Sequence, residues 1–116
     1  MANLANRARG EYGERRAAAW YAARGFEILA RNWRSGRSGE LDLVVRSGSL
    51  VVVCEVKARR TSDYGFAAEA VTASKQARIR RLALDFLAAN ELRGVTLRFD
   101  VAAVTGTEID VYEDVF

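Results

Sequence analysis

Residues 40–59 constrain the fold of this chain more than any other segment, because their pattern predicts a two-stranded β-hairpin. Two largely apolar runs, ELDLVVRS and LVVVCEVKAR, flank the pair Gly48 and Ser49. Glycine at the first of two central positions is typical of a type II′ turn, which joins neighbouring antiparallel strands. Pairing Ser47 with Leu50 across this turn then fixes the register of the whole hairpin.

This register sorts the side chains of the hairpin onto two faces. Side chains alternate along a strand, so one face receives only apolar residues and belongs in the core. That predicted core face consists of Leu41, Leu43, Val45, Leu50, Val52, Cys54 and Val56. The other face is apolar toward the turn, but it carries Glu40, Asp42, Glu55 and Lys57 at its far end. A slip of one residue would mix the two sets, which supports the register.

The segments around the hairpin complete an α/β pattern. Many Ala, Arg and Glu residues predict a helix over 3–24, and an apolar stripe at helical spacing predicts a second helix over 74–90. We expect strands over 26–34, 40–47, 50–59, 95–104 and 109–112, and a loop over 59–65. The order αβββαβ(β) predicts a mixed sheet flanked by helices, in which the second helix makes a right-handed crossover between parallel strands.

The composition is that of a globular protein. With 116 residues, 50% of them hydrophobic and 28% charged, the chain predicts a single domain over 1–116. No apolar run is long enough to span a membrane, and the N-terminal residues lack the apolar run of a secretory signal. The single cysteine, Cys54, excludes an internal disulfide. We therefore expect a cytoplasmic protein without a membrane partner.

The sequence contains no histidine. This excludes the Ser/His/Asp and Cys/His nucleophilic arrangements and the HExxH zinc site. An enzyme of this composition must rely on carboxylates, on lysine and, where the chemistry needs one, on a metal ion.

The charge is unevenly distributed along the chain. Residues 1–94 contain seventeen basic and ten acidic residues, whereas residues 95–116 contain one basic and five acidic residues, so the net charge is +3. A basic body with an acidic end is a plausible footprint for nucleic-acid binding. The abundance of arginine can equally reflect the base composition of the genome, and the charge by itself does not separate these explanations.

The opposed carboxylates of the hairpin are the candidate chemical site. In the predicted register, Asp42 lies opposite Glu55, and like charges directly opposite destabilise a sheet. A divalent cation such as Mg²⁺ would neutralise them, because it accepts one or two carboxylates and keeps water in its remaining positions. Lys57 is placed to align an attacking water or to stabilise a phosphate. The alternative is a plain ion-pair network of Lys57 with Glu40 and Glu55.

The motif context favours the chemical interpretation. GELD at 39–42, followed after the hairpin turn by VCEVK at 53–57, resembles the D…E-x-K core of the PD-(D/E)xK nuclease superfamily. The wider chain resembles the YraN-like family of small bacterial proteins, which is close to archaeal Holliday-junction resolvases. The matching stretches are GEYGERRAAAWYAARGFEILARNWR, GELDLVV, LVVVCEVKAR, EAVTASKQARIRRLA and RFDV. This resemblance implies a restriction-endonuclease-like core.

Carried over by position, the resemblance makes Asp42 and Glu55 ligands of Mg²⁺ or Mn²⁺ and Lys57 the catalytic lysine. It also makes Glu14 the acidic residue of the first helix, with a catalytic and metal-binding role. From the residues alone, Glu14 lies along the apolar face of that helix and needs a partner, either a metal ion or an arginine. Lys75 begins the second helix, where it is expected to reach the same pocket or a phosphate.

The expected DNA contacts are basic residues near the proposed site. They are Arg31, Arg34, Arg37, Arg59, Arg60, Lys75 and Arg78. Trp33 and Tyr64 are candidates for stacking on unpaired bases, although Trp33 is more typical of a core residue. Asp100 is expected to pair with Arg98 in a structural role.

These observations predict a metal-dependent DNA endonuclease, structure-specific or resolvase-like, with nucleic acid as its partner and a homodimer as its expected assembly by analogy with resolvases. The alternative is a non-catalytic nucleic-acid-binding or partner-binding module with a nuclease-like fold. A third reading is a structural interaction protein in which the carboxylates and lysine form only ion pairs.

Overall fold

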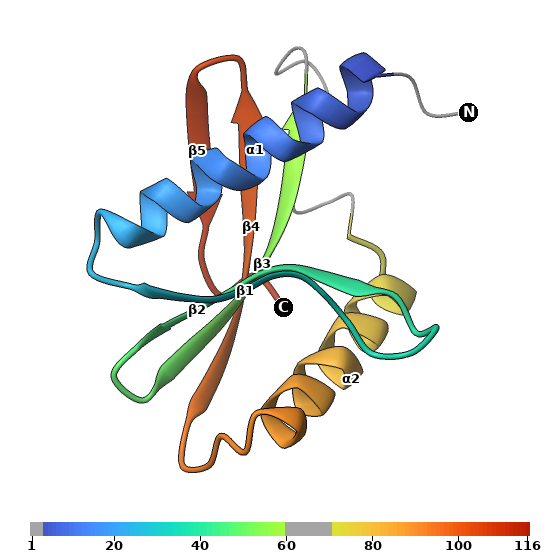
Figure 1. The fold of residues 1–116 in the computed structure, drawn as a ribbon, viewed down its shortest axis with the longest axis vertical. Coiled ribbons are helices and arrows are strands. Elements are labelled where there is room, and N and C mark those ends of the chain that lie inside the picture. The colour runs from blue at the N-terminus through green and yellow to red at the C-terminus, as the bar shows by residue number, and fades with distance from the viewer. Residues whose placement is uncertain (1–3, 60–70) are drawn as a thin grey trace.

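The structure, a computed structural model, describes residues 4–59 and 71–116 (Figure 1). The elements are α1 (Leu4–Ala22), β1 (Glu27–Arg34), β2 (Glu40–Ser47), β3 (Leu50–Arg59), α2 (Ala73–Ala89), β4 (Thr96–Thr105) and β5 (Glu108–Tyr112). This is the predicted order, with boundaries within a few residues of those expected. The chain has the α/β architecture of a five-stranded mixed sheet flanked by two helices, consistent with a restriction-endonuclease-like core.

The sheet has the strand order β1-β2-β3-β4-β5. Strands β3 and β4 are parallel and are joined through α2, whereas the other neighbouring strands are antiparallel. At the hairpin turn, Gly48 has a φ of 59° and Ser47 pairs with Leu50, as the predicted type II′ turn requires. The predicted register is confirmed from this turn to the pair Leu43 and Cys54.

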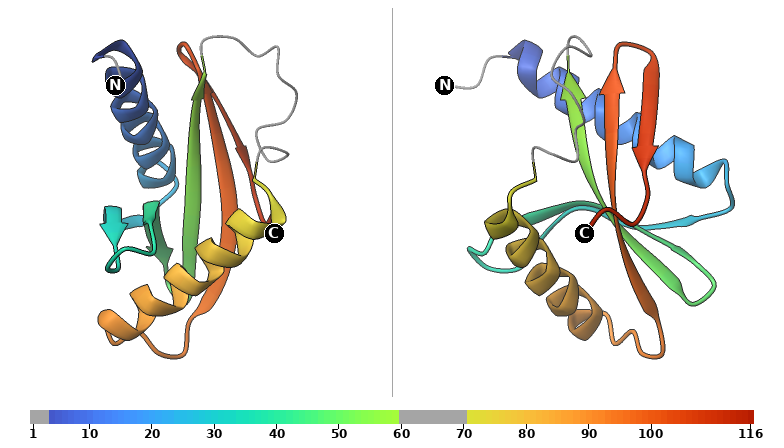
Figure 2. Two further views of the ribbon diagram at one scale, coloured as in Figure 1. Left: turned by 90° about the vertical axis from the view of Figure 1, so that its right-hand side faces the viewer. Right: turned by 180° about the vertical axis from the view of Figure 1, so that it is seen from behind.

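The two helices cover opposite faces of the sheet (Figure 2). The α1 face buries Ala17, Ala18, Tyr21, Leu43, Val45, Val52, Cys54 and Ala102. The α2 face buries Leu41, Val44, Val51, Val53, Val71, Ile79, Leu82, Ala83, Phe86, Phe99 and Val101. Among the described residues, neither helix is long and apolar enough to cross a membrane.

Two residues of β1 and β2 show how this end of the sheet departs from simple alternation. Leu41 belongs to the α2 cluster, so the expectation that it shares a face with Leu43 is wrong. Beyond Leu43, β2 is no longer paired with β3 but stays paired with β1, so Leu41 lies beside its partner Trp33 against the α2 cluster. Trp33, which pairs with Leu41, packs edge-on against Phe86, and the centroids of the two rings are 5.2 Å apart. Trp33 therefore packs against the core.

Helix α1 approaches the sheet closely at Gly13. A Cβ atom built on Gly13 would lie 2.9 Å from the Cβ of Ala58 on β3, closer than packed carbon atoms tolerate. Glycine therefore lets the backbone of α1 rest directly on β3. The helix ends before Gly25, which has a φ of 87°, a left-handed conformation typical of a residue that follows a helix.

A buried carboxylate ties α1 to the second half of the sheet. Asp100 is fully buried and accepts hydrogen bonds from the hydroxyl of Tyr21 at 2.6 Å and from the backbone amide of Asp114 at 2.9 Å. It also forms a two-pronged ion pair with Arg98, in which both nitrogen–oxygen distances are 3.0 Å. Asp100 is therefore a structural residue, and it pairs with Arg98 as expected.

Candidate carboxylate and lysine site

The site forms where β2 separates from β3. In a continued antiparallel ladder, the backbone amide of Val56 would donate to the carbonyl of Leu41. It donates instead to the Oδ2 atom of Asp42 at 2.9 Å. The carboxylate of Asp42 thus replaces a backbone acceptor at the point where the hairpin opens. The expected pairing of Asp42 with Glu55 lies one residue beyond the observed ladder, but both side chains line one pocket.

This pocket has a volume of about 350 Å³ and lies between the opened hairpin and the N-terminal end of α2. Its lining residues are Gly39, Glu40, Asp42, Glu55, Lys57, Lys75, Arg78 and Ile79. The three residues that the sequence singled out for chemistry therefore converge in space. Lys75 joins them from α2, as expected, because the parallel crossover starts this helix beside the carboxyl-terminal half of β3.

Glu55 is the most unusual group in the pocket. Its side chain is only 4% exposed, and its Oε2 atom is buried without a hydrogen-bond partner among the described residues. The backbone amide of Asp42 donates a hydrogen bond to the Glu55 carboxylate. Burial, followed by the negative charge of Asp42, raises the pKa of Glu55 to about 7. Burial also raises the pKa of Asp42, so the pair resists carrying two negative charges.

The two lysines partly offset these carboxylates. Burial and the nearby ammonium group of Lys75 lower the pKa of Lys57, while Glu55 and Asp42 act in the opposite direction. Lys75 is held at the start of α2, where its backbone amide donates to the Oγ1 atom of Thr72 at 3.2 Å. Both lysines lower the pKa of both carboxylates. With Glu40 and Arg78 included, the lining of the pocket therefore has three acidic and three basic side chains.

Glu14 is not brought into this pocket. It is half-buried on α1, and its Oε2 atom accepts a hydrogen bond from the side-chain amide of Asn32 at 2.7 Å. The partner in the structure is thus neither of the two expected, a metal ion or an arginine. Its charge nevertheless raises the pKa of Asp42. Within the described residues, no group of three or more histidine, cysteine, aspartate or glutamate side chains is placed to hold a metal ion.

Asn32 is a residue that the sequence reasoning missed. It lies within β1 at a φ of 53°, in the left-handed region that asparagine adopts more readily than most residues. The pairing of β1 with β2 keeps the same register on either side of Asn32, and the Asn32 amide reaches Glu14 on α1. An asparagine inside an otherwise regular strand was the available signal, because asparagine is depleted from strands.

The carboxylate oxygens of Asp42 and Glu55 are suitable ligands for a hard divalent cation. Mg²⁺ is usually bound through one or two carboxylates and retains several water molecules, so a third protein ligand is not required. The structural observation that supports the fit is the partnerless oxygen of Glu55 beside Asp42. Glu14 does not line the pocket, but its charge acts on Asp42, and its role as a metal ligand stays a prediction.

The expected DNA-contacting residues have different surroundings. Arg31 and Arg37 are exposed, and Arg34 is exposed but forms an ion pair with Glu40 at 3.0 Å. Arg78 lines the carboxylate pocket, and Arg59 lines a second cavity at the end of β3. Arg60, Tyr64 and most of the expected loop over 59–65 lie outside the described residues.

The chain is similar in sequence to the members of one protein family. A family model described as "Uncharacterised protein family UPF0102" matches residues 13–104. A UPF0102 protein of Frankia casuarinae is 54% identical over 96 residues, which cover 83% of this chain and 80% of the relative. A UPF0102 protein of Frankia alni is 50% identical over 105 residues, covering 90% and 87% respectively. A UPF0102 protein of Roseiflexus castenholzii is 46% identical over 97 residues, covering 83% and 77%.

Proposed function

This chain belongs to the UPF0102 family, and we propose that it is a metal-dependent endonuclease that hydrolyses phosphodiester bonds in DNA. The membership confirms the YraN-like resemblance inferred from the sequence motifs. The activity rests on the chemistry of the carboxylate and lysine pocket, because the family description names none.

The observation that carries the proposal is the buried, partnerless oxygen of Glu55. Burying a carboxylate oxygen without a hydrogen bond is costly, and the neighbouring Asp42 increases that cost when both groups are ionised. In a purely structural site, an ion pair would be expected to satisfy such a carboxylate. In the part of the chain that the structure describes, neither carboxylate forms an ion pair within 4.0 Å. A divalent cation would satisfy both groups together.

The residues of the pocket have complementary roles in this proposal. Asp42 and Glu55 would hold Mg²⁺ or Mn²⁺, and the bound ion would supply Lewis-acid stabilisation of the phosphoryl group and activation of water. Lys57 would orient the attacking water from the strand that carries Glu55. Lys75 and Arg78 would bind the phosphate oxygens from α2, because both side chains line the same pocket.

A non-catalytic nucleic-acid-binding module is the second candidate. The pocket lining favours it, since three basic side chains balance three acidic ones there without a cation. This candidate predicts salt-dependent DNA binding that neither Mg²⁺ nor Mn²⁺ strengthens, together with an absence of cleavage.

A cleavage assay separates these candidates. Supercoiled plasmid and a four-way junction are incubated with the wild type, Glu55→Gln, Lys57→Ala and the control Glu108→Gln, in Mg²⁺, Mn²⁺ or EDTA. Glu108 is exposed on β5, so its substitution removes the same charge away from the pocket. We expect metal-dependent cleavage by the wild type and the control, and a loss of at least about a hundredfold in both pocket variants. Equal cleavage by all four proteins would refute the assignment.

Metal binding and assembly are measured on the same preparations. Titration calorimetry with Mn²⁺ should show one site in the wild type and weaker binding in Glu55→Gln, whether or not DNA is cleaved. Light scattering after size-exclusion chromatography tests the homodimer proposed by analogy with resolvases.

A further inference from the structure

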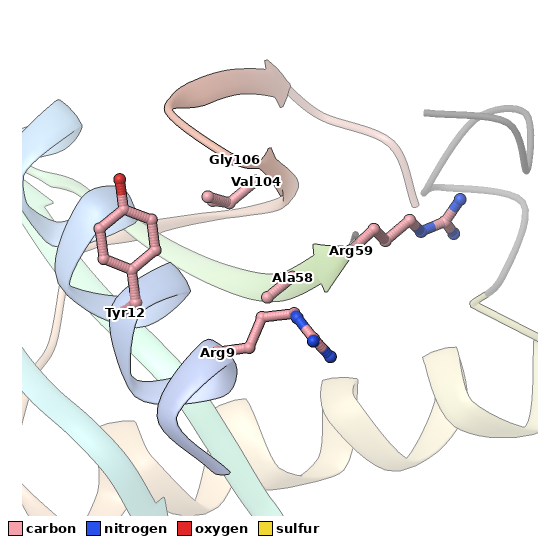
Figure 3. A pocket seen from close by; sticks show the side chains of 6 residues that line it. All are labelled: Arg9, Tyr12, Ala58, Arg59, Val104 and Gly106. Atoms are coloured by element: carbon pink, nitrogen blue, oxygen red, sulfur yellow. The ribbon is translucent and has the colours of Figure 1, made fainter. Parts of the chain in front are cut away.

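A second cavity, of about 270 Å³, lies on the α1 side of the sheet. Its described lining residues are Arg9, Tyr12, Ala58, Arg59, Val104 and Gly106. Figure 3 shows the Val104 side chain directed toward the Tyr12 ring, with Arg9 extending from α1 past Ala58. Arg59 extends from the end of β3. The cavity is thus lined by an aromatic ring, two apolar side chains and the side chain of Arg9, whereas the Arg59 side chain runs away from the Tyr12 ring in Figure 3.

The close packing of α1 shapes this cavity. Tyr12 and Arg9 precede Gly13 by one and four residues, so they flank the point where the helix rests on Ala58. One turn after Tyr12, the Nη2 atom of Arg16 donates to the carbonyl of Thr107 at 2.7 Å. This bond fixes α1 to the turn between β4 and β5. The Nε atom of Arg16 is buried and has no hydrogen-bond partner among the described residues.

A short stretch of β3 separates this cavity from the carboxylate pocket. Lys57 lines the pocket on the α2 side, and the next residue, Ala58, lines the cavity on the α1 side. The pairing of β3 with β4 continues to Arg59, but its observed pairing with β2 ends at Cys54. Among the described residues, therefore, no strand pairs with the other edge of β3 beyond Cys54. An extended ligand that passes around this edge, from the α2 face to the α1 face, would reach both sites.

We propose that the second cavity binds one nucleotide of a single-stranded DNA segment adjacent to the phosphate held in the carboxylate pocket. The adjacency rests on the proposed function. Guanidinium groups bind phosphate, an aromatic ring stacks on an unpaired base, and Ala58 and Val104 suit the apolar faces of a base or sugar. The volume lies just below the range of about 300–1,000 Å³ for small-molecule pockets, which favours one nucleotide unit.

This assignment specifies a substrate class. A base paired inside a duplex is stacked on its neighbours and cannot lie against Tyr12, whereas a base in an overhang or flap can. The preferred substrate is therefore a duplex that carries a single-stranded segment, rather than blunt duplex DNA.

Binding in EDTA tests the assignment without any requirement for cleavage. Fluorescence anisotropy compares a blunt duplex with the same duplex bearing a short overhang, for the wild type, Tyr12→Ala and Tyr12→Phe. We expect the wild type to prefer the overhang, and Tyr12→Ala to weaken overhang binding by roughly tenfold or more. Tyr12→Phe retains the ring and should bind within about twofold of the wild type. Thermal melts establish that each variant is folded.

The arginine contribution is tested with a matched pair on α1. Arg9→Gln should reduce the slope of log K against log salt by about 0.7 for each lost phosphate contact on a single strand. Arg7→Gln removes the same charge from an exposed position about 200° around the helix and should leave the slope unchanged. Equal slopes for the two variants would contradict a phosphate contact at Arg9.

The outcomes distinguish this inference from the proposed function. Equal wild-type affinity for blunt and overhanging DNA, or an equal loss on both in Tyr12→Ala, overturns the nucleotide site and leaves the endonuclease proposal standing. Overhang preference that depends on Tyr12, without cleavage in Mn²⁺, supports the nucleotide site and refutes the endonuclease. A free mononucleotide that binds through Tyr12, without any overhang preference, assigns the cavity to a small ligand and also overturns the DNA subsite.

Discussion

Replacing Glu55 with glutamine should stabilise the metal-free protein at alkaline pH. Burial and the neighbouring Asp42 raise the pKa of Glu55 from an ordinary value of 4.5 to about 7. The folded protein therefore holds the Glu55 proton more tightly than the unfolded chain does. Glutamine has nearly the same shape, cannot ionise, and keeps a side-chain oxygen that accepts from the Asp42 backbone amide.

The sign and size of the effect follow from proton linkage. Because the pKa is raised in the folded state, the Glu55 contribution to stability is fully present below about pH 4.5 and is lost as the pH rises through about 7. One pKa unit corresponds to about 1.4 kcal/mol, so the shift represents up to about 3 kcal/mol in a site that is almost fully buried. For a chain of this length, that corresponds to roughly 10 °C in Tm.

Thermal unfolding in EDTA measures this effect at pH 4.5 and pH 8.0. We expect Glu55→Gln to melt about 10 °C above the wild type at pH 8.0 and close to it at pH 4.5. The control Glu108→Gln should have the same Tm as the wild type at both pH values. Added Mn²⁺ should then raise the Tm of the wild type much more than that of Glu55→Gln, because ligand binding stabilises only the protein that binds it. A variant that melts below the wild type at pH 8.0, or that shows the same difference at both pH values, would refute the reasoning.

Two further predictions concern the structure that supports the site. Asp100→Asn should destabilise the fold by about 3 kcal/mol in urea denaturation, because it removes the buried charge that Arg98, the Tyr21 hydroxyl and the Asp114 amide all contact. Asp110→Asn at an exposed position should change stability by less than about 0.5 kcal/mol. Gly13→Ala should destabilise by about 1–3 kcal/mol, because its Cβ atom would press on Ala58 at 2.9 Å. Gly10→Ala on the same helix meets no atom within 4 Å and should stabilise by up to about 1 kcal/mol. A destabilised Gly10→Ala together with an unaffected Gly13→Ala would contradict the observed helix packing.

The parts of the site that depend on local pattern could be predicted from the sequence. Alternation along two strands and a glycine at the turn determine which side chains share a face, and these rules act over a few residues. They were sufficient to bring Asp42, Glu55 and Lys57 together. The apolar stripe of α2 and the crossover rule then placed Lys75 near them.

Other features depend on contacts between segments that are distant in the sequence. Glu14 had two plausible partners from helix periodicity, yet its carboxylate accepts a hydrogen bond from Asn32, a left-handed residue in β1 whose amide reaches α1. The separation of β2 from β3, which the regular ladder did not predict, is stabilised by the Asp42 side chain and redirects Leu41 into the α2 core.

The sequence by itself therefore determined the order of the elements, the hairpin register and the residue types available for chemistry. Only the tertiary structure decided which carboxylate oxygen is buried without a partner, and that Arg9 and Tyr12 form a second cavity one residue along β3 from Lys57. The physical reason is that side-chain alternation is a property of each strand, whereas burial and cavities arise from how closely α1, α2 and the twisted sheet pack.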